Sequence, residues 1–193
     1  LRSSAAASVI GNTVVGNAAG INIRGNDNTV IGDVAGGNIT TGARNIVIVG
    51  GSLANAYPVF NVTTQNDRIV IGGLLSTNAY INVPWTVVSD ARDKTDFAPV
   101  PHGLEFVTQL QPTAFRRKVS RDDTEAHGDV HYGLLAQDVL ALEGDNPVII
   151  DAEDPEQLKL KDQSLLAVLV KAVQELKVEL DATKAELAAL RGA

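Results

Sequence analysis

A serine and a lysine stand five positions apart in the polar stretch SDARDK, which runs from Ser89 to Lys94. A serine hydroxyl becomes a strong nucleophile when a base removes its proton, and a neutral lysine amine is one such base. The reference pKa of a lysine side chain is about 10.4, so a Ser-Lys site must favour the neutral amine by burial or by nearby positive charge. The pair is therefore a candidate for breaking a peptide bond.

The neighbouring residues bear on the charge and the geometry of this pair. Arg92 can supply positive charge, whereas Asp90 and Asp93 would oppose it if they approached the ammonium. Five residues of α-helix turn about 500° and leave the end side chains roughly 140° apart. Ser89 and Lys94 can therefore meet in a turn after a strand, or Lys94 serves Ser89 of a neighbouring chain. Spacing alone favours a polar turn in which Ser89 is an N-cap.

The same stretch separates two halves of different composition. Residues 1–88 contain four Arg and three Asp, whereas residues 89–193 contain 12 basic and 20 acidic residues. We place a domain boundary between Val88 and Ser89. The acidic second half argues against nucleic acid as a partner, because phosphate binding needs clustered Lys and Arg.

The composition narrows the class of protein further. The chain has 193 residues, enough for one or two domains, and 45% of them are hydrophobic. It has no cysteine, and none of its three histidines has ligand spacing such as HExxH, so we predict no metal and no cofactor. There is no apolar run of about 18 residues and no signal peptide, so we expect no membrane insertion. The lack of methionine suggests a piece of a longer chain.

Four short blocks recur in the first half, each a β-branched run that ends in glycine. They are NTVVG at 12–16, NTVIG at 28–32, NIVIVG at 45–50 and DRIVIGG at 67–73. The pattern is typical of a β-solenoid or of an interwound β-stem. Each block has only two to four apolar side chains, so we favour a stem interwound with identical chains over one chain stacked on itself.

The last thirty residues carry a heptad pattern that predicts a coiled-coil helix over residues 164–191. Its seam positions alternate by three and four residues and are Leu166, Leu169, Val173, Leu176, Leu180, Thr183, Leu187 and Leu190. Glu179 precedes Lys184 by five residues and Glu186 precedes Arg191 by five, as in parallel helices. The alternative is a single amphipathic helix packed on its own domain.

The start of this helix has a wider apolar face than a seam requires. Val168, Val170 and Ala172 lie outside the a and d positions. A coiled-coil seam needs only those two positions. We therefore expect this part of the helix to dock on the globular part of the chain, and the remainder to pair with other chains.

Four motifs of the second half occur in the order found in a known family. They are SDARDKTD (89–96), LEFVTQLQPTAFRRK (104–118), HYGLLAQDV (131–139) and LLAVLVKAVQELKVEL (165–180). Together they resemble the C-terminal intramolecular chaperone domain of phage tailspikes and tail fibres, best known from the endosialidase tailspike. The resemblance covers residues 89–193, and the Asn- and Gly-rich stem is similar to repeats that precede such domains.

The resemblance implies a domain that trimerises the fibre during folding and then cuts itself off before the serine of a Ser-Asp motif. Ser89 matches the nucleophile and Lys94 the general base, so the scissile bond is that between Val88 and Ser89. Asp90 and Arg92 match flanking polar positions. The implied activity is that of a self-cleaving serine endopeptidase with a single turnover, in cis or between subunits.

His131 also matches a histidine of the family. The resemblance implies that it orients the site or stabilises the oxyanion. The alternative is a buried strand histidine that bonds to the backbone.

These features predict a mainly β stem at residues 1–88, interwound in a trimer as a triple β-helix, and an α+β chaperone domain at residues 89–193 that ends in a parallel coiled coil. The predicted protein is a homotrimeric tail fibre or tailspike of a virion, folded in the bacterial cytoplasm. Upstream fibre domains of the same chain are partners, other parts of the fibre bind the host receptor, and the cleaved chaperone is released. The alternative is a non-cleaving fibre or adhesin stem with a permanent trimerisation anchor.

Overall fold

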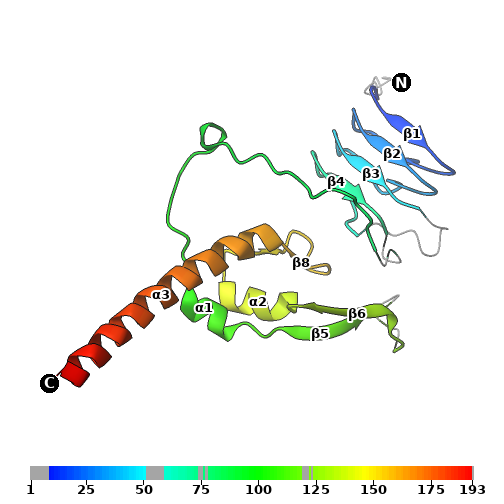
Figure 1. The fold of residues 1–193 in the computed structure, drawn as a ribbon. Coiled ribbons are helices and arrows are strands. Elements are labelled where there is room, and N and C mark those ends of the chain that lie inside the picture. The colour runs from blue at the N-terminus through cyan, green and yellow to red at the C-terminus, as the bar shows by residue number, and fades with distance from the viewer. Residues whose placement is uncertain are drawn as a thin grey trace, which may run out of the picture. The chain divides into compact units, whose positions relative to one another are not determined.

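The computed structural model describes residues 9–50, 59–73, 76, 78–118, 122 and 124–192. The chain divides into two compact units, which we describe one at a time (Figure 1). The first unit contains the four repeated blocks. The second contains residues 82–116 and the chain from Val130 onward.

The repeated blocks form four three-residue strands, β1 (Thr13–Val15), β2 (Thr29–Ile31), β3 (Ile46–Ile48) and β4 (Ile69–Ile71). They pair in parallel and in chain order, with their middle valines aligned. Successive coils of one chain therefore lie side by side, as the row of arrows in Figure 1 shows. This is the self-stacked arrangement that we had weighed but not favoured.

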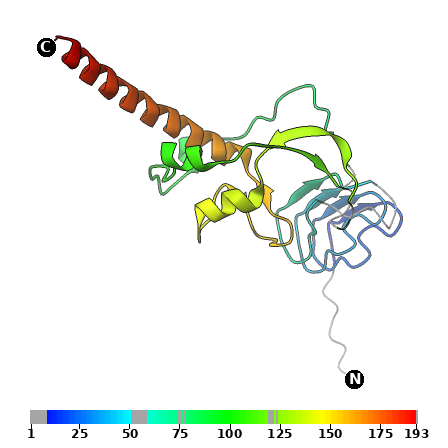
Figure 2. The same cartoon turned by 90° about the horizontal axis from the view of Figure 1, so that it is seen from below.

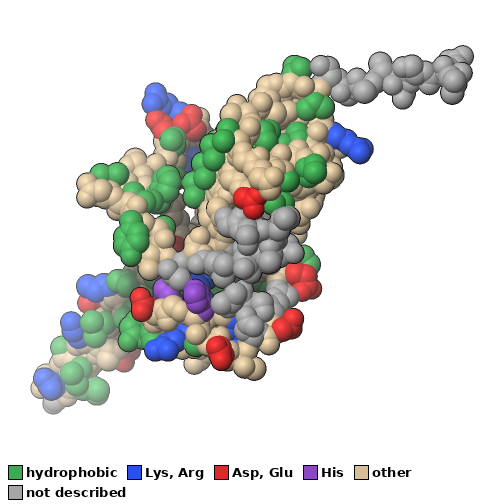
Figure 3. All heavy atoms as spheres, turned by 90° about the vertical axis from the view of Figure 1, so that its right-hand side faces the viewer, with side chains coloured by type: hydrophobic (Ala, Val, Ile, Leu, Met, Phe, Trp, Pro, Cys, Tyr) green, Lys and Arg blue, Asp and Glu red, His purple; other side chains and the backbone are tan. Residues whose placement is uncertain are grey.

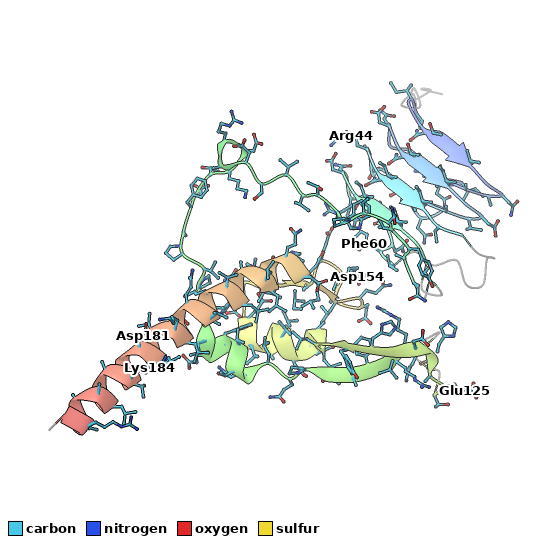
Figure 4. All side chains as sticks on the ribbon, viewed as in Figure 1. Arg44, Phe60, Glu125, Asp154, Asp181 and Lys184 are labelled. Atoms are coloured by element: carbon cyan, nitrogen blue, oxygen red, sulfur yellow. The ribbon has the colours of Figure 1, made fainter. Side chains whose placement is uncertain are left out.

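The core of this unit explains why one chain can stack on itself. The middle residues of β2 to β4 point inward, while the flanking residues are mostly exposed. The turns between the blocks add further apolar side chains, so the buried cluster consists of Val30, Ala35, Ile39, Val47, Val49, Phe60, Val62 and Val70. Figure 4 labels Phe60 among these coils. Our expectation counted only the blocks and so underestimated the core; an interwound trimeric stem stays a prediction.

Buried asparagines continue the stack beside the strands. Asn28 and Asn45 are fully buried. The Oδ1 of Asn12 accepts hydrogen bonds from the backbone N and the Nδ2 of Asn28, at 2.8 and 3.0 Å. The Oδ1 of Asn28 accepts in the same way from Asn45, at 3.1 and 3.0 Å, and the Oδ1 of Asn45 accepts from the N–H of Arg68 at 3.0 Å. Since buried amides need partners, this ladder helps to set the register of the coils.

Glycines at the ends of the blocks let the coils approach closely. Gly32 has a φ of +125°, and a Cβ at this position would lie 1.6 Å from the carbonyl oxygen of Val49. Gly16, one coil earlier, has a φ of +135° and would clash in the same way with the oxygen of Gly32. Only glycine satisfies both the backbone angle and the spacing, which accounts for the glycine that ends each of these blocks.

The outer side of the stacked strands is apolar and lies in solvent. None of the four strands contains a charged residue. The exposed side chains include Val15, Ile31, Ile46, Ile48, Ile69 and Ile71. Figure 3 shows that hydrophobic side chains occupy part of the molecular surface. Large exposed apolar patches are typical of interaction surfaces.

The second unit is a small mixed fold around one long helix (Figure 2). Its elements are η1 (Ala91–Asp93), α1 (Leu104–Gln109), α2 (Ala136–Glu143), β7 (Ile150–Asp151), β8 (Lys159–Leu160) and α3 (Asp162–Gly192). It also contains most of β5 (Thr113–Arg117) and the second half of β6 (His127–Gly133), whereas residues 117–129 group with the first unit. Strands β5 and β6 form one two-stranded sheet, and β7 pairs antiparallel with β8. The matched motif HYGLLAQDV (131–139) runs from the end of β6 into α2, and β7 follows α2.

The core of the second unit joins three helices and β7. Phe106, Val139, Ile149, Ile150 and Val168 form its buried cluster. The loop that precedes β7 is held by the carboxylate of Glu143 at the end of α2, which accepts the backbone N–H groups of residues 148, 149 and 150 at 2.8, 2.7 and 2.8 Å. The cluster anchors the start of α3 to the rest of the unit.

Helix α3 is 31 residues long, and only its start is covered by its own unit. Val168 and Ala172 are buried there, as expected for a docking turn, whereas Val170 is exposed. The seam residues remain in solvent, with Leu166, Leu176 and Leu180 exposed by 60%, 51% and 46%. Docking therefore leaves the seam uncovered. No helix in the described ranges has the length and apolarity needed to cross a membrane.

The asparagine ladder yields a first prediction. Asn45→Ala removes the acceptor of the Arg68 N–H and the donor to the carbonyl oxygen of Gln65. Asn45 itself is fully buried, and losing the hydrogen bonds of a buried group costs about 1–3 kcal/mol, so urea denaturation should show a loss of roughly 1–3 kcal/mol in the unfolding free energy of this unit. The control is Asn17→Ala, whose exposed amide bonds to Asp33 and should cost less than about 0.5 kcal/mol. Equal losses would contradict a special role for the ladder.

Candidate active site

The chain that leads to the Ser-Lys pair lies in solvent. Val83, Trp85 and Val88 are exposed by 64%, 76% and 80%. Residues 82–88 form no strand, and their backbone makes no hydrogen bond within the described parts of the chain. The run that looks strand-like in sequence is thus an unpaired, apolar segment in the single chain.

A short capped turn brings the chain back on itself directly after this segment. Asp90 is the N-cap of η1, and its Oδ1 accepts the backbone N–H of Arg92 at 2.9 Å. The N–H of Asp93 donates to the carbonyl oxygen of Asp90, and that of Lys94 donates to the oxygen of Ala91, both at 3.2 Å. The turn is the single green coil on the trace before α1 in Figure 1.

The turn brings Lys94 and Ser89 together. The Nζ of Lys94 lies 2.6 Å from the Oγ of Ser89, within hydrogen-bond distance. A base must lie about 2.6–3.2 Å from the proton-bearing atom in order to act on it. Of our two alternatives for the pair, the structure shows the turn within one chain. Both side chains lie on the surface of that chain.

Arg92 and Asp90 pair with each other. The Nε and Nη2 of Arg92 lie 3.0 and 2.6 Å from the two carboxylate oxygens of Asp90. The guanidinium of Arg92, followed by its backbone N–H, holds the pKa of Asp90 below its ordinary value, and the same pairing raises the pKa of Arg92. Arg92 is thus engaged in bracing the turn, and its charge is compensated by Asp90. Because the pair is exposed, its contribution to stability is small.

His131 lies in β6, and its ring stacks on that of Phe115 in β5 with 5.8 Å between the centroids. The structure does not bring it together with the candidate pair: within the described ranges, no hydrogen bond links His131 to Ser89 or Lys94. Nor does any other described side chain bond to the Ser89 Oγ or the Lys94 Nζ.

Sequence analysis did not single out Lys171 and Glu175 of α3, which hold the chain between the turn and α1. The Nζ of Lys171 donates to the carbonyl oxygens of Val100 and Pro101 at 2.7 and 3.3 Å. The Oε2 of Glu175 accepts the N–H of Leu104 at 2.6 Å. This bond, followed by the charge of Lys171, lowers the pKa of Glu175. The only signal in the sequence is a Lys and a Glu four residues apart, which is common on helix surfaces.

The described residues contain no group of three or more His, Cys, Asp or Glu that could hold a metal ion. The chemistry that the geometry offers is thus proton removal from a serine hydroxyl by an amine, next to the peptide bond that precedes the serine.

Comparison with known families identifies the domain. Residues 89–146 match the family model described as chaperone of endosialidase, which is classed as a peptidase family. This part of the chain is similar to that family, in agreement with the resemblance of its motifs, and the match begins at Ser89. Comparisons with curated proteins and with solved structures gave no match.

The pairing of Asp90 with Arg92 predicts a change in acid titration. The pairing stabilises the turn at pH values above the ordinary aspartate pKa. This stabilisation is lost as the pH falls through the lower pKa that Asp90 has in the folded chain. In Arg92→Gln, the pKa of Asp90 should rise toward its ordinary value, because the guanidinium is its main partner. Carboxyl-carbon NMR titration measures this in a Ser89→Ala background, with Arg117→Gln as the control. An unchanged Asp90 midpoint in Arg92→Gln would contradict the pairing.

Proposed function

We propose that this chain is the C-terminal part of a phage tail fibre or tailspike, whose chaperone domain drives homotrimerisation and then releases itself by cleavage between Val88 and Ser89. The family match supports a chaperone role in a phage fibre. The observation that carries the cleavage proposal is the 2.6 Å contact between the Lys94 Nζ and the Ser89 Oγ at the first residue of the matched segment. The fibre belongs to the virion, and other parts of it bind the host surface.

The proposed reaction proceeds in two steps. Lys94, as a neutral amine, takes the proton of the Ser89 hydroxyl, and the Oγ attacks the carbonyl carbon of Val88. The C–N bond breaks, Lys94 returns the proton to the leaving nitrogen of Ser89, and an ester joins Val88 to the Ser89 side chain. Water then hydrolyses the ester, which gives a carboxylate on Val88 and an amino group on Ser89. This follows the usual logic of covalent catalysis by an activated hydroxyl.

Assembly would cover the Ser89–Lys94 pair, which is exposed in the single chain. A neighbouring chain that covers the exposed pair would disfavour a charged amine and could present donors to the developing oxyanion. Cleavage would then follow trimerisation, which gives the fibre a folding checkpoint. The required rate is low, because one cleavage per chain within about an hour corresponds to an activation free energy of ~22 kcal/mol.

The long helix supports assembly through a parallel coiled coil. Its seam is exposed in the single chain. Within the described part of the chain, Glu179, Lys184, Glu186 and Arg191 form no ion pair, so they remain available for g-to-e pairing between helices. Figure 4 shows Lys184 on the stretch of α3 that extends past α1.

The unpaired segment before the site is a second reason to expect partner chains. Its valines and Trp85 are exposed, and its backbone forms no hydrogen bond with the residues that the structure describes. A trimer anchored at α3 raises the local concentration of these segments and of the stems, which would otherwise need slow association of separate chains. Loss of the chaperone would then leave the assembled stem kinetically trapped.

An inert fibre or adhesin stem with a permanent C-terminal trimerisation anchor is the alternative function. The exposed seam of α3 fits both proposals, because both need a trimer. Only the cleavage proposal uses the contact between Ser89 and Lys94.

Self-cleavage predicts two fragments, residues 1–88 and 89–193, in the purified wild-type protein. Ser89→Ala removes the nucleophile and Lys94→Ala removes the base, so intact mass spectrometry should show a drop in cleavage of at least about 100-fold for each, in line with the usual effect of a lost acid-base group. Matched controls are Ser164→Ala and Lys161→Ala, at the start of α3, which should cleave like wild type. A wild-type chain that stays whole as an assembled trimer would favour the inert stem.

Trimerisation through the seam predicts a position-specific effect of charge. Leu176→Asp places a carboxylate in the seam and should dissociate the trimer, because a buried unpaired charge is costly. Val178→Asp is the matched control, because Val178 is also apolar and exposed but lies at an f position outside the seam. Light scattering gives the mass of each. Trimers of equal stability in both variants would rule out this seam.

A further inference from the structure

Two side chains of α3 form hydrogen bonds with the segment that joins the Ser89–Lys94 turn to α1 and with the first residue of α1. Lys171 bonds to the carbonyl oxygens of Val100 and Pro101, and Glu175 bonds to the N–H of Leu104. The two side chains also pair with each other, at 3.5 Å from Nζ to Oε1. Three backbone groups before and at the start of α1 are thereby joined to two side chains of α3 across about 70 residues of sequence.

Glu175 acts as the missing cap of α1. Gly103 is the N-cap residue of α1 and has no side chain to accept the first N–H groups. The carboxylate of Glu175 occupies this place, so closely that a Cβ on Gly103 would lie 2.1 Å from its Oε2. The contact needs both a glycine at position 103 and a long acidic side chain from α3.

We propose that Lys171 and Glu175 are positioning residues that couple the assembly of α3 to the cleavage turn. The inference rests on the proposed self-cleavage and adds the route by which the helix acts on it. Neither residue touches the reacting atoms. They act by fixing the end of the linker from which Lys94 approaches Ser89.

The linker, residues 95–103, joins the turn to the contacts of Lys171 and Glu175, which together we call the clamp. Two prolines restrict its backbone near the clamp. Pro99 and Pro101 restrict their own φ angles, and each also confines the preceding residue to extended backbone. Asp96 has a φ of +55°, an uncommon angle for a non-glycine residue. The two prolines restrict the backbone at the end of the linker that Lys171 contacts, and a shift at Val100 would be passed on toward Lys94 from there.

The clamp leaves the seam of α3 free. Lys171 and Glu175 lie at f and c positions, whereas Leu169, Val173 and Leu176 occupy the adjoining seam positions and are exposed. Pairing of the seams would fix the rotation of α3 about its axis, and through the clamp it would fix the linker. Assembly and site geometry are thus linked by side chains that need not contact a neighbouring chain.

The test compares the clamp with a matched ion pair further along α3. Glu175→Gln and Lys171→Met weaken the clamp, while Asp181→Asn and Lys177→Met break a pair of the same spacing whose partners both lie on α3. In trimers of equal mass, the clamp variants should cleave roughly ten- to a hundredfold more slowly, because a small misplacement of reacting groups has effects of that size. The control variants should cleave like wild type, and Glu175→Ala should be slower than Glu175→Gln.

A second measurement does not depend on cleavage. In a Ser89→Ala background, hydrogen exchange of the Leu104 amide and of residues 89–96 should be faster by at least about tenfold with Glu175→Gln than with Asp181→Asn. Wild-type cleavage with equal rates in the clamp and control variants would overturn the coupling but leave self-cleavage intact. Absence of wild-type cleavage would overturn the proposed function, and unchanged exchange at residues 89–96 would then overturn the positioning role as well.

Discussion

The candidate site depends on one local constraint, the capped turn that reverses the chain between Ser89 and Lys94. Asp90 accepts the N–H of Arg92 and pairs with its guanidinium, and the turn then delivers the lysine amine to the serine hydroxyl. A regular helix would hold these two side chains apart. The three-residue turn Ala91–Asp93 thus sets the distance between the two side chains of the candidate site.

The single chain leaves three apolar surfaces exposed to solvent, and the proposed partner chains could bury all three. The outer side of β1 to β4, the segment that precedes Ser89 and the seam of α3 all expose branched aliphatic side chains. The segment before Ser89 also has unpaired backbone groups. Water can satisfy them in one chain, but a second chain can satisfy them and bury the apolar side chains as well. Partner chains would therefore stabilise the protein and enclose the site together.

Sequence patterns predicted the local elements better than the contacts between distant ones. The glycine-ended blocks became strands, and the heptad run became α3, because both depend on short-range periodicity. The self-stacked coils were not favoured, since half of their core, including Ile39, Phe60 and Val62, lies outside the repeated blocks. The Ser-Lys contact was one of two arrangements left open by spacing. Whether Arg92 or the aspartates act on Lys94 was also left open, because sequence shows possible charges but does not show which of them pair.

The self-stacked stem changes what a chaperone would have to do. Its coils bury a shared core and pair their asparagines within one chain, so the coils themselves do not depend on α3. What one chain cannot do is cover the charge-free outer side of its strands. A trimerising helix would then be needed to bring three stems into contact, and not to fold each stem. If such a contact held the stems together by itself, the proposed removal of the chaperone domain would leave the assembled stem intact.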